Sequence, residues 1–346
     1  MFIRLAVNIQ DIADILGENW LKYKSCFVKG LENDNPLLQK INNYLYDNGG
    51  KQLRPALSLL AAQSCGEPNS VSWRCAAVSE MIHTATLLHD DVVDNSDTRR
   101  GALTVKAFFS SAASVLTGDF WLSRALYLLA RSGSDILNCF TFALEELADG
   151  ELFQMQKADA LDISEEDYYK IIYKKTASLF IAALKSAVLS VNGTERELQL
   201  IEKYGYELGV AFQIRDDIFD YSPAYNTGKP YGEDIRERKI TLPLIAAFNK
   251  AGNQERGRII DLMLSTSLTD KDAVDNLVGT VFSFVNEHNG ISSAENRLAA
   301  HSQKAIELIN RLQTELTGRF GVLSTVQVKS LDCLRSLAVF VGKRKS

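Results

Sequence analysis

Asp90, Asp91 and Asp94 lie just before Arg99 and Arg100, in the stretch LLHDDVVDNSDTRRG. On a helix, positions 90 and 94 would project two carboxylates from one face, a single turn apart. Unpaired carboxylates at that spacing repel each other. A solvated acidic helix end would explain the stretch without any function. A cation shared by the carboxylates would explain it as a binding site.

The same spacing recurs in FQIRDDIFDY, where Asp216, Asp217 and Asp220 again close an apolar helix. This recurrence favours the functional interpretation. Oxygen ligands without neighbouring cysteine or clustered histidine suit Mg²⁺ or Mn²⁺ better than zinc. Mg²⁺ usually binds through one or two carboxylates plus the phosphates of a substrate. The two acidic motifs therefore predict a phosphorylated substrate.

Basic residues beside turns fit that substrate, because arginine and lysine side chains are the usual phosphate ligands. Each alone is best explained as a solvated surface charge, and only their clustering near the acidic motifs points to binding. The chain has no GxxxxGK[ST] loop, so a molecule with phosphates at one end and an apolar remainder is expected rather than a nucleotide. The candidates are Lys51, Arg54, Arg99, Arg100, Lys175, Thr176, Lys229 and Lys239.

The elements that must position these residues are helices. No proline occurs between Pro68 and Pro223, and apolar residues recur at three- and four-residue spacing, as in SLFIAALKSAVLSV. Turn signals in DNGGK, CGEPNS, NSDTRRG, RSGSD and VNGT separate the helical segments. The pattern predicts an all-α fold, a single domain over residues 1–346, and a surface loop or lid over 222–239.

Composition excludes several other classes. With 46% hydrophobic and 23% charged residues and a net charge of −5, the chain has the composition of a globular protein and no nucleic-acid partner is expected. The N-terminus has too short an apolar run for a signal peptide or a membrane span, so we expect a cytoplasmic protein. Five unevenly spaced cysteines predict neither disulfides nor a zinc site.

The chain resembles the trans-isoprenyl diphosphate synthases, in particular their long-chain polyprenyl members of the octaprenyl type. The resemblance rests on motifs that occur in the family's order over about residues 49–247: GGKQLRP, EMIHTATLLHDDVVDNSDTRRG, LTGDFWLSRAL, ELADGELFQ, KKTASLF, FQIRDDIFDY and GKPYGEDIRERKITLPLI. It implies an isoprenoid-synthase-type helical bundle around a deep central apolar cavity, in a homodimer. The implied substrates are isopentenyl diphosphate and an allylic diphosphate.

Residue roles follow from the resemblance position by position. Isopentenyl diphosphate would be held by Gly50, Lys51, Arg54, His83 and Arg100, and the allylic diphosphate by Arg99, Lys175, Thr176, Gln213, Lys229 and Lys239. Two or three Mg²⁺ ions, with Mn²⁺ as an alternative, would bind Asp90, Asp94 and Asp216, supported by Asp91, Asp217 and Asp220. One departure is visible: Arg238 stands where the family commonly has a glycine before the lysine.

The implied reaction is ionisation of the allylic diphosphate, attack of the isopentenyl double bond on the resulting cation, and loss of a proton, with the released diphosphate as the expected base. An apolar pocket would keep water from the cation. Short-chain members carry bulky aromatics four and five residues before the first motif. Thr86 and Ala85 stand there in this chain, with Ile82 and Met81 a turn further along, which predicts a long, membrane-seeking product, commonly destined for a quinone side chain.

Three alternatives stay open at this point. A short-chain farnesyl or geranylgeranyl diphosphate synthase would share every motif except the small residues at 85 and 86. A class I terpene cyclase has an aspartate-rich motif but typically no second DDxxD and no GGKxLRP. A non-catalytic subunit of a heteromeric synthase would tend to lack one or both acidic motifs. Deeper residues that could stop the growing chain are Phe120, Trp121 and Tyr127.

Overall fold

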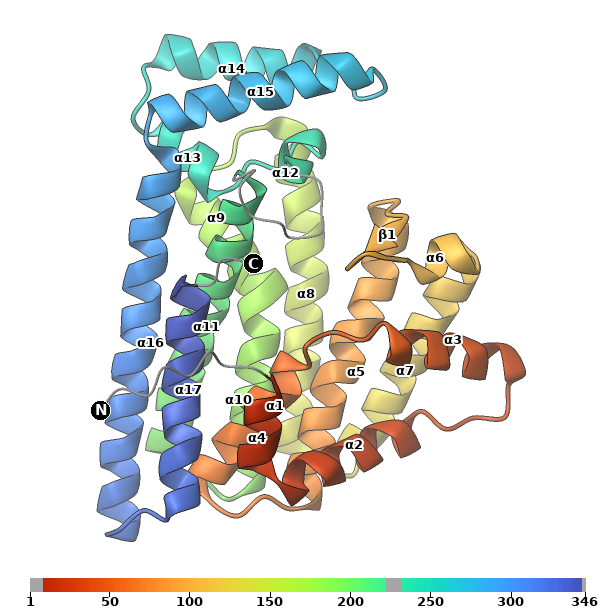
Figure 1. Cartoon of the computed structure of the whole chain (residues 1–346), viewed down its shortest axis with the longest axis vertical. Coiled ribbons are helices and arrows are strands. Elements are labelled where there is room, and N and C mark those ends of the chain that lie inside the picture. The colour runs from red at the N-terminus through yellow and green to blue at the C-terminus, as the bar shows by residue number, and fades with distance from the viewer. Residues whose placement is uncertain (1–8, 222–231, 344–346) are drawn as a thin grey trace. The chain divides into compact units, whose positions relative to one another are not determined.

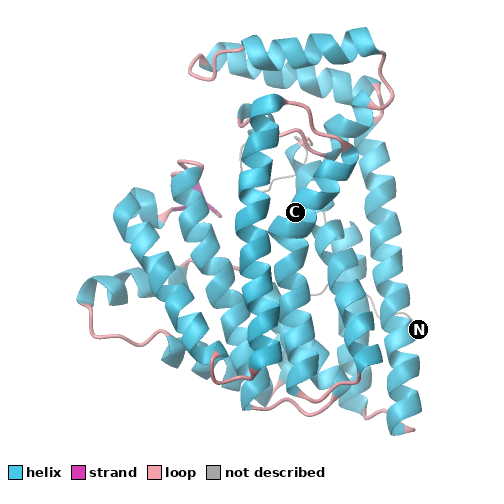
Figure 2. Ribbon diagram, turned by 180° about the vertical axis from the view of Figure 1, so that it is seen from behind, coloured by secondary structure: helices cyan, strands magenta, loops and turns pink. Residues whose placement is uncertain are grey.

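The computed structural model describes residues 9–221 and 232–343. These residues are almost entirely helical (Figure 1), and the only sheet among them has two short strands. Figure 2 shows the same predominance of helix from behind. The prediction of an all-α fold is confirmed. Lys229 lies outside the described residues, as does most of the predicted 222–239 loop.

The described chain forms two compact units. Unit 1 contains the described residues up to Glu145, together with 179–205 and 305–340, and unit 2 contains 146–178, the described part of 206–304, and 341–343. Five helices contribute residues to both: α8 (Ser134–Ala160), α10 (Ser178–Ser190), α11 (Glu195–Asp220), α16 (Gly290–Phe320) and α17 (Thr325–Lys343). The expectation of a single domain stays a prediction.

The remaining elements of unit 1 precede α8 in the chain. They are α1 (Ile9–Leu16), α2 (Glu18–Gly30), α3 (Pro36–Asp47), α4 (Leu53–Cys65), α5 (Ser70–Val93), β1 (Thr98–Arg99), β2 (Ala102–Leu103), α6 (Val105–Phe108) and α7 (Ser111–Leu129). The signals DNGGK and CGEPNS fall between or at the ends of these elements, RSGSD and VNGT follow α7 and α10, and NSDTRRG includes β1 and the hairpin loop.

Helix α5 is the central element of unit 1. It begins after Asn69, whose side chain accepts a hydrogen bond from the backbone N–H of Val71 at 2.8 Å, while the hydroxyl of Ser72 accepts one from the backbone of Asn69. Helices α2, α4 and α7 pack against it. At its other end the backbone N–H of Asp94 still donates to the carbonyl of Asp90, at 2.8 Å. Helical geometry therefore extends through the first acidic motif.

Strands β1 and β2 form a hairpin with a two-residue loop, in which Thr98 pairs with Leu103 and Arg99 with Ala102. Both loop residues have positive φ, 54° at Arg100 and 80° at Gly101, as in a type I′ turn. The sequence predicts only a turn here. The hairpin fixes the direction in which the adjacent arginines leave the backbone.

Unit 2 contains α9 (Glu165–Ile172), the π-helix η1 (Tyr173–Ala177), α12 (Glu233–Arg236), α13 (Leu242–Phe248), α14 (Asn253–Ser265) and α15 (Lys271–Glu287). Ser164 and Asp167 cap the start of α9 through reciprocal hydrogen bonds of 3.0 Å. Helix α9 continues through η1 into α10 without a break. Residues 233–236, predicted as loop, form one helical turn.

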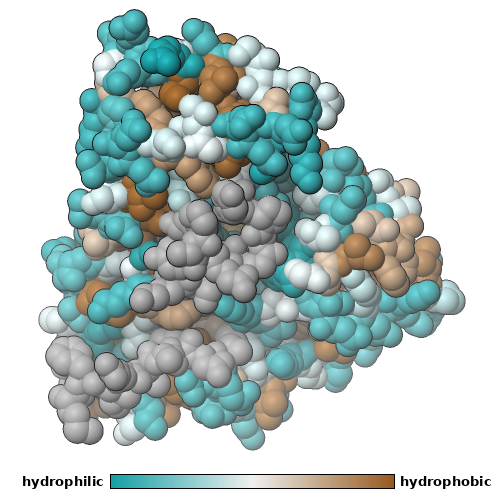
Figure 3. All heavy atoms as spheres, turned by 45° about the horizontal axis from the view of Figure 1, so that its top comes forward, coloured by the Kyte–Doolittle hydropathy of each residue, from teal (hydrophilic) through white to brown (hydrophobic). Residues whose placement is uncertain are grey.

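None of the described helices is both long and apolar enough to cross a bilayer. On the face drawn in Figure 3, polar side chains predominate and the apolar ones form smaller patches between them. Helix α7 carries several exposed apolar side chains, with Leu116 the most exposed at 67% and Val115, Leu126 and Tyr127 between 37% and 44%.

Candidate functional site

The two acidic motifs share one pattern of burial. In each, the middle aspartate is buried, with Asp91 3% and Asp217 4% exposed. The flanking residues are more accessible: Asp90, Asp216 and Asp220 are half-buried and Asp94 is exposed. Each motif therefore presents an accessible pair of carboxylates four residues apart, on α5 and on α11, as the sequence predicts. The buried middle aspartates bond instead to neighbouring side chains.

Asp91 is bound by an arginine of the hairpin. The Nε of Arg99 donates to Oδ1 of Asp91 at 2.7 Å. Because the aspartate is buried and the arginine only partly so, this charge-assisted bond fastens the hairpin to the end of α5. It leaves Arg99 near the first acidic motif, where the sequence predicts a diphosphate ligand.

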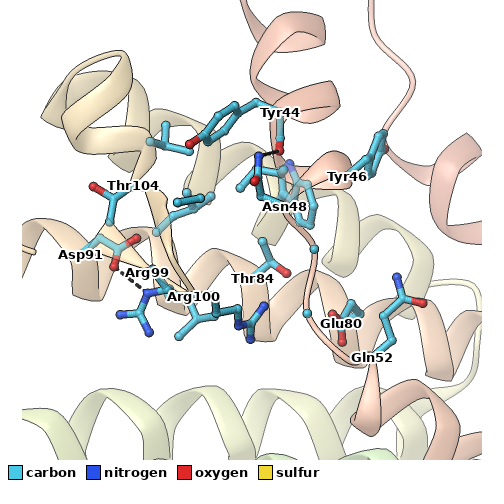
Figure 4. A pocket seen from close by; sticks show the side chains of 18 of the residues that line it. Tyr44, Tyr46, Asn48, Gln52, Glu80, Thr84, Asp91, Arg99, Arg100 and Thr104 are labelled. Atoms are coloured by element: carbon cyan, nitrogen blue, oxygen red, sulfur yellow. Dashed lines mark hydrogen bonds and ion pairs between the residues drawn. The ribbon is translucent and has the colours of Figure 1, made fainter. Parts of the chain in front are cut away.

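A cavity of about 350 Å³ lies in unit 1 beside this pair. Its apolar part includes Phe27, Leu88 and Trp121, and its polar part includes the hairpin arginines, the Gly49–Gly50 turn and Glu80. Figure 4 shows Arg99 turned toward Asp91, whereas Arg100 points toward Thr84 and Glu80.

Gly50 is in direct contact with the Arg100 guanidinium. A Cβ built at Gly50 would lie only 2.3 Å from Nη1 of Arg100, so any side chain there would displace the guanidinium. The structure thus brings together the GGKQLRP turn and the arginine pair, which lie about fifty residues apart in the sequence. Lys51 is exposed at the same turn, just before α4.

His83 lies close to the same positive charges. Burial lowers the pKa of His83 well below its usual value, and Arg54, Arg100 and Arg99 lower it further. The imidazole is therefore neutral in this structure, and the positive charge around it comes from three guanidinium groups. A strong local positive potential is what a diphosphate requires.

Glu80, which the sequence analysis does not single out, is the acid that faces this cluster. It is only 6% exposed. Burial raises the pKa of Glu80, against the opposing effect of Arg54 and Arg100. Its place three residues before His83 on an apolar helix was the available signal, since a glutamate is seldom fully buried without a charged partner.

Unit 2 contains the second set of predicted ligands, on and around η1. Nζ of Lys175 lies 2.5 Å from Oε2 of Glu151 and also donates to Gln154. Its neighbour Lys174 is buried against Glu146 and Asp149. The two adjacent lysines thus have separate partners on α8, and π-turns of this kind are frequent at functional sites.

Thr176, buried on η1, bonds to α11. Its hydroxyl donates to Oε1 of Gln213 at 2.7 Å. The close approach of the helices depends on Gly209, where a Cβ would lie 2.6 Å from Cα of Ala177. The structure therefore brings Lys175, Thr176 and Gln213 together, as the resemblance implies.

Asp217 lies beside this group, in contact with two donors. Oδ1 accepts from Gln213 at 2.8 Å and Oδ2 from the hydroxyl of Tyr168 at 2.5 Å. Burial raises the pKa of Asp217 to about 7, opposed by these hydrogen bonds, while Asp216 and Asp220 raise it further. Tyr168, six residues before the KKTASLF motif, is a second residue that sequence reasoning missed.

A further acid, Asp234, adjoins the second motif. The carboxylate of Asp220 accepts the backbone N–H groups of Glu233 and Asp234 at 2.9 and 3.1 Å. Burial raises the pKa of Asp234 well above its usual value, as do Asp220 and Asp217, whereas Lys239 lowers it. Lys239 therefore lies near the second acidic motif, with its Nζ 2.5 Å from Glu237.

Arg238 has φ 57°, which explains why a glycine is common at this position. A non-glycine residue in this left-handed conformation costs about 1–2 kcal/mol. The guanidinium of Arg238 donates to the carbonyl oxygen of Thr266 at 3.2 Å, which offsets part of this cost. The loop before Lys239 thus keeps the left-handed backbone conformation that a glycine would favour.

The second motif offers a set of oxygen donors that suits a divalent cation. Asp216 and Asp220 raise the pKa of Asp217, and Asp220 and Asp217 raise the pKa of Asp234, so these four carboxylates lie close to one another. Within the described ranges, no three histidine, cysteine or carboxylate side chains form a ready-made metal cage. Such an open site suits a metal that takes part of its ligands from a substrate.

The predicted length-controlling residues lie on α5 below the first motif. Ala85, Ile82 and Met81 are fully buried, whereas Thr86 is half-buried and its hydroxyl donates to the carbonyl of His83 at 2.9 Å. Among the suggested deeper stops, Trp121 is buried and its indole donates to Asn42. Phe120 is half-buried, and Tyr127 is 44% exposed.

This chain is similar to known octaprenyl and nonaprenyl diphosphate synthases. The chain is 38% identical over 308 residues to an octaprenyl diphosphate synthase of Haemophilus influenzae, which covers 88% of this chain and 92% of that protein. It is 34% identical over 306 residues to an all-trans-nonaprenyl-diphosphate synthase of Rhodobacter capsulatus, covering 88% and 92%.

Solved structures give the same result. A decaprenyl diphosphate synthase from Rhodobacter capsulatus superposes with a TM-score of 0.84 at 29% identity, over 98% of this chain and 99% of that one. A polyprenyl synthase from Caulobacter crescentus CB15, complexed with calcium and isoprenyl diphosphate, has a TM-score of 0.84 at 28% identity, over 98% of both chains. Residues 35–281 match the profile described as polyprenyl synthetase. With these two acidic motifs and this match, the chain belongs to the polyprenyl synthetase family.

Proposed function

We propose that this prenyltransferase condenses isopentenyl diphosphate repeatedly, head to tail, onto an allylic diphosphate to give a long all-trans polyprenyl diphosphate. Its similarity to octaprenyl and nonaprenyl diphosphate synthases over most of their length supports the long-chain class. The observation that carries the two-substrate reaction is the presence of two sets of basic residues, one around the Gly49–Gly50 turn and the hairpin of unit 1 and one on and around η1 of unit 2. A cyclase that binds a single diphosphate has no need of both.

Isopentenyl diphosphate binds, in this proposal, to Gly50, Lys51, Arg54, His83 and Arg100. The neutral imidazole of His83 can donate a hydrogen bond from one ring nitrogen, while the guanidinium groups supply positive charge. Holding the substrate by its diphosphate fixes the position of its double bond, which then needs no activating group of its own.

The allylic diphosphate binds to Arg99, Lys175, Thr176, Gln213 and Lys239, and Lys229 is proposed from the resemblance alone. Arg99 and Lys175 each contact a carboxylate in this structure, Asp91 and Glu151. These carboxylates hold the cationic groups in place before the substrate arrives, which lowers the entropic cost of binding.

Mg²⁺ would be held by Asp90 and Asp94 at the end of α5 and by Asp216 on α11, with Asp91, Asp217 and Asp220 in support. When bound, it neutralises charge on the leaving diphosphate. Cleavage of the carbon–oxygen bond leaves an allylic cation, which the double bond of isopentenyl diphosphate attacks. The released diphosphate then takes the proton. Apolar side chains around the hydrocarbon part exclude the water that would quench the cation.

Product length depends on residues that precede Asp90 on α5. We infer that the small side chain of Ala85, with Thr86 and Ile82 beside it, leaves room for a growing chain. The fifth residue before Asp90 lies about 7.5 Å along the helix axis from it. An aromatic ring at that depth would stop elongation early.

A homodimer is also proposed, and the exposed apolar residues of α7 support it. Val115 and Leu126 lie on one side of the helix, with Leu116 and Tyr127 adjacent, so they form one broad apolar face. Burying such a face against a second copy is a common solution for soluble chains.

The decisive experiment incubates purified protein with labelled isopentenyl diphosphate, farnesyl diphosphate and Mg²⁺, and sizes the extracted prenyl products. We expect a ladder that ends at one long chain, lost on chelation with EDTA and restored by added Mg²⁺. Products that stop after one or two additions would indicate a short-chain synthase. No incorporation by folded protein would indicate a missing partner subunit or cyclase chemistry.

A further inference from the structure

Tyr168, in unit 2, makes a hydrogen bond to the second acidic motif. It lies on α9, 2% exposed, and its hydroxyl donates to Oδ2 of Asp217 at 2.5 Å. The other carboxylate oxygen of Asp217 accepts from Nε2 of Gln213 at 2.8 Å. Both oxygens of the middle aspartate thus have neutral donors, contributed by two different helices.

The bonds continue through Gln213 to the substrate side. The amide nitrogen of Gln213 faces Asp217, and its carbonyl oxygen faces Thr176. The Thr176 hydroxyl donates to that oxygen at 2.7 Å. Tyr168 and Thr176 therefore lie at the two ends of one hydrogen-bonded chain, and the orientation of each member depends on the next.

We propose that Tyr168 is a positioning residue for the allylic diphosphate site, which it orders by holding Asp217 and, through Asp217, the amide of Gln213. The inference rests on the proposed function, because it assigns Thr176 and Gln213 to the allylic substrate. Tyr168 itself touches neither substrate. Without the Tyr168 hydroxyl, the Asp217 carboxylate can rotate, and the amide of Gln213 loses its fixed direction.

The next residue provides a matched control. Tyr169 is half-buried, and its ring lies 5.6 Å from that of Tyr168 and 5.7 Å from that of His301, whereas the tyrosine hydroxyl that donates to Asp217 is that of Tyr168. Tyr169→Phe removes the same oxygen atom one position along the same helix. A difference between the two variants isolates the contact with Asp217 from the general effect of removing a tyrosine hydroxyl.

The test compares wild type, Tyr168→Phe and Tyr169→Phe in steady state, with each substrate varied in turn. For Tyr168→Phe we expect the KM for farnesyl diphosphate to rise about tenfold, equivalent to about 1.4 kcal/mol, and the KM for isopentenyl diphosphate to stay unchanged. Calorimetric titration with farnesyl thiolodiphosphate and Mg²⁺ should show the same tenfold loss of affinity without turnover. Tyr169→Phe should match wild type in both.

Asp217→Asn provides a second variant and a double-mutant cycle. Its amide cannot accept from both Tyr168 and Gln213, so we expect the same selective rise in the allylic KM, and Tyr168→Phe should add nothing in that background. Because Asp217 is also proposed to support Mg²⁺, the Asp217→Asn variants are assayed at saturating Mg²⁺; if Tyr168→Phe alone does not fold, Asp217→Asn then still tests the chain of bonds by this selectivity.

Three results would overturn the inference: an equal rise in both KM values, unchanged KM values whether or not the melting temperature falls, or additive effects of the two substitutions. Wild-type activity separates this test from that of the proposed function. A wild-type protein that does not elongate farnesyl diphosphate overturns the function itself, whereas an active wild type with an unaltered Tyr168→Phe overturns only the role of Tyr168.

Discussion

Replacing Gly50 by alanine should weaken the binding of isopentenyl diphosphate without unfolding the protein. The new Cβ would lie 2.3 Å from Nη1, 2.7 Å from Cζ and 2.8 Å from Nη2 of Arg100. Non-bonded heavy atoms prefer about 3.5 Å or more, so the guanidinium must move by about 1 Å. Because the guanidinium is the end of a long, flexible side chain, the fold can accommodate its movement.

The size of the effect follows from what Arg100 would lose. A hydrogen bond to a charged group contributes about 1.5–3 kcal/mol. At about 1.4 kcal/mol for each factor of ten, loss of the Arg100 contact predicts a rise in the KM for isopentenyl diphosphate of roughly 10- to 100-fold. The KM for the allylic substrate should change little, since Arg100 is assigned to the other diphosphate.

The assay varies isopentenyl diphosphate at saturating farnesyl diphosphate and Mg²⁺, and records thermal unfolding by circular dichroism in parallel. Gly49→Ala is the matched control, because a Cβ there would meet only backbone oxygens, at 3.3 Å from Tyr46 and 3.5 Å from Leu45. An unchanged KM in Gly50→Ala, or an equal rise in Gly49→Ala, would refute the reasoning.

Three further predictions concern other parts of the chain. Ala85→Phe should shorten the longest product by at least one isoprene unit, as resolved by mass spectrometry, and an unaltered product length would reject the proposed route along α5. In the wild type, the free energy of unfolding should fall as the pH drops below about 6.5, because the pKa of folded His83 is lowered and only the unfolded chain takes up a proton on this histidine. His83→Gln should make this fall smaller. Urea unfolding across pH without substrate measures the effect, and an unaltered pH slope speaks against it. Leu116→Glu, at the most exposed apolar position of α7, should halve the particle mass found by light scattering, and an intact dimer would exclude this face as the interface.

The acidic motifs were the most predictable part of the site. Carboxylates at i and i+4 share a helix face by geometry alone, and the structure presents Asp90 with Asp94, and Asp216 with Asp220, in that way. Turn residues likewise predicted where most helices end. Local spacing and backbone preference suffice for such features.

Contacts between distant segments could not be predicted in the same way. Nothing in the letters around Tyr168 indicates that its hydroxyl meets Asp217, forty-nine positions later. The placement of Glu80 near Arg54 and Arg100 also depends on tertiary packing. The hydrogen bond between Arg99 and Asp91 depends on a hairpin that the sequence indicates only as a turn. Side-chain contacts between different elements follow from tertiary packing, which cannot be read directly from a single sequence.

The π-helix η1 has a consequence for how such a site could arise. Thr176 comes eight positions after Tyr168, and on a regular α-helix side chains at that separation point about 80° apart around the axis. One extra residue taken up in a π-turn turns the following helix back by about 100°, which leaves the two side chains within about 20° of each other. A single-codon insertion therefore suffices to bring two residues into phase toward the same neighbouring helix. A relative without that residue could keep every letter of KKTASLF and still lack the alignment.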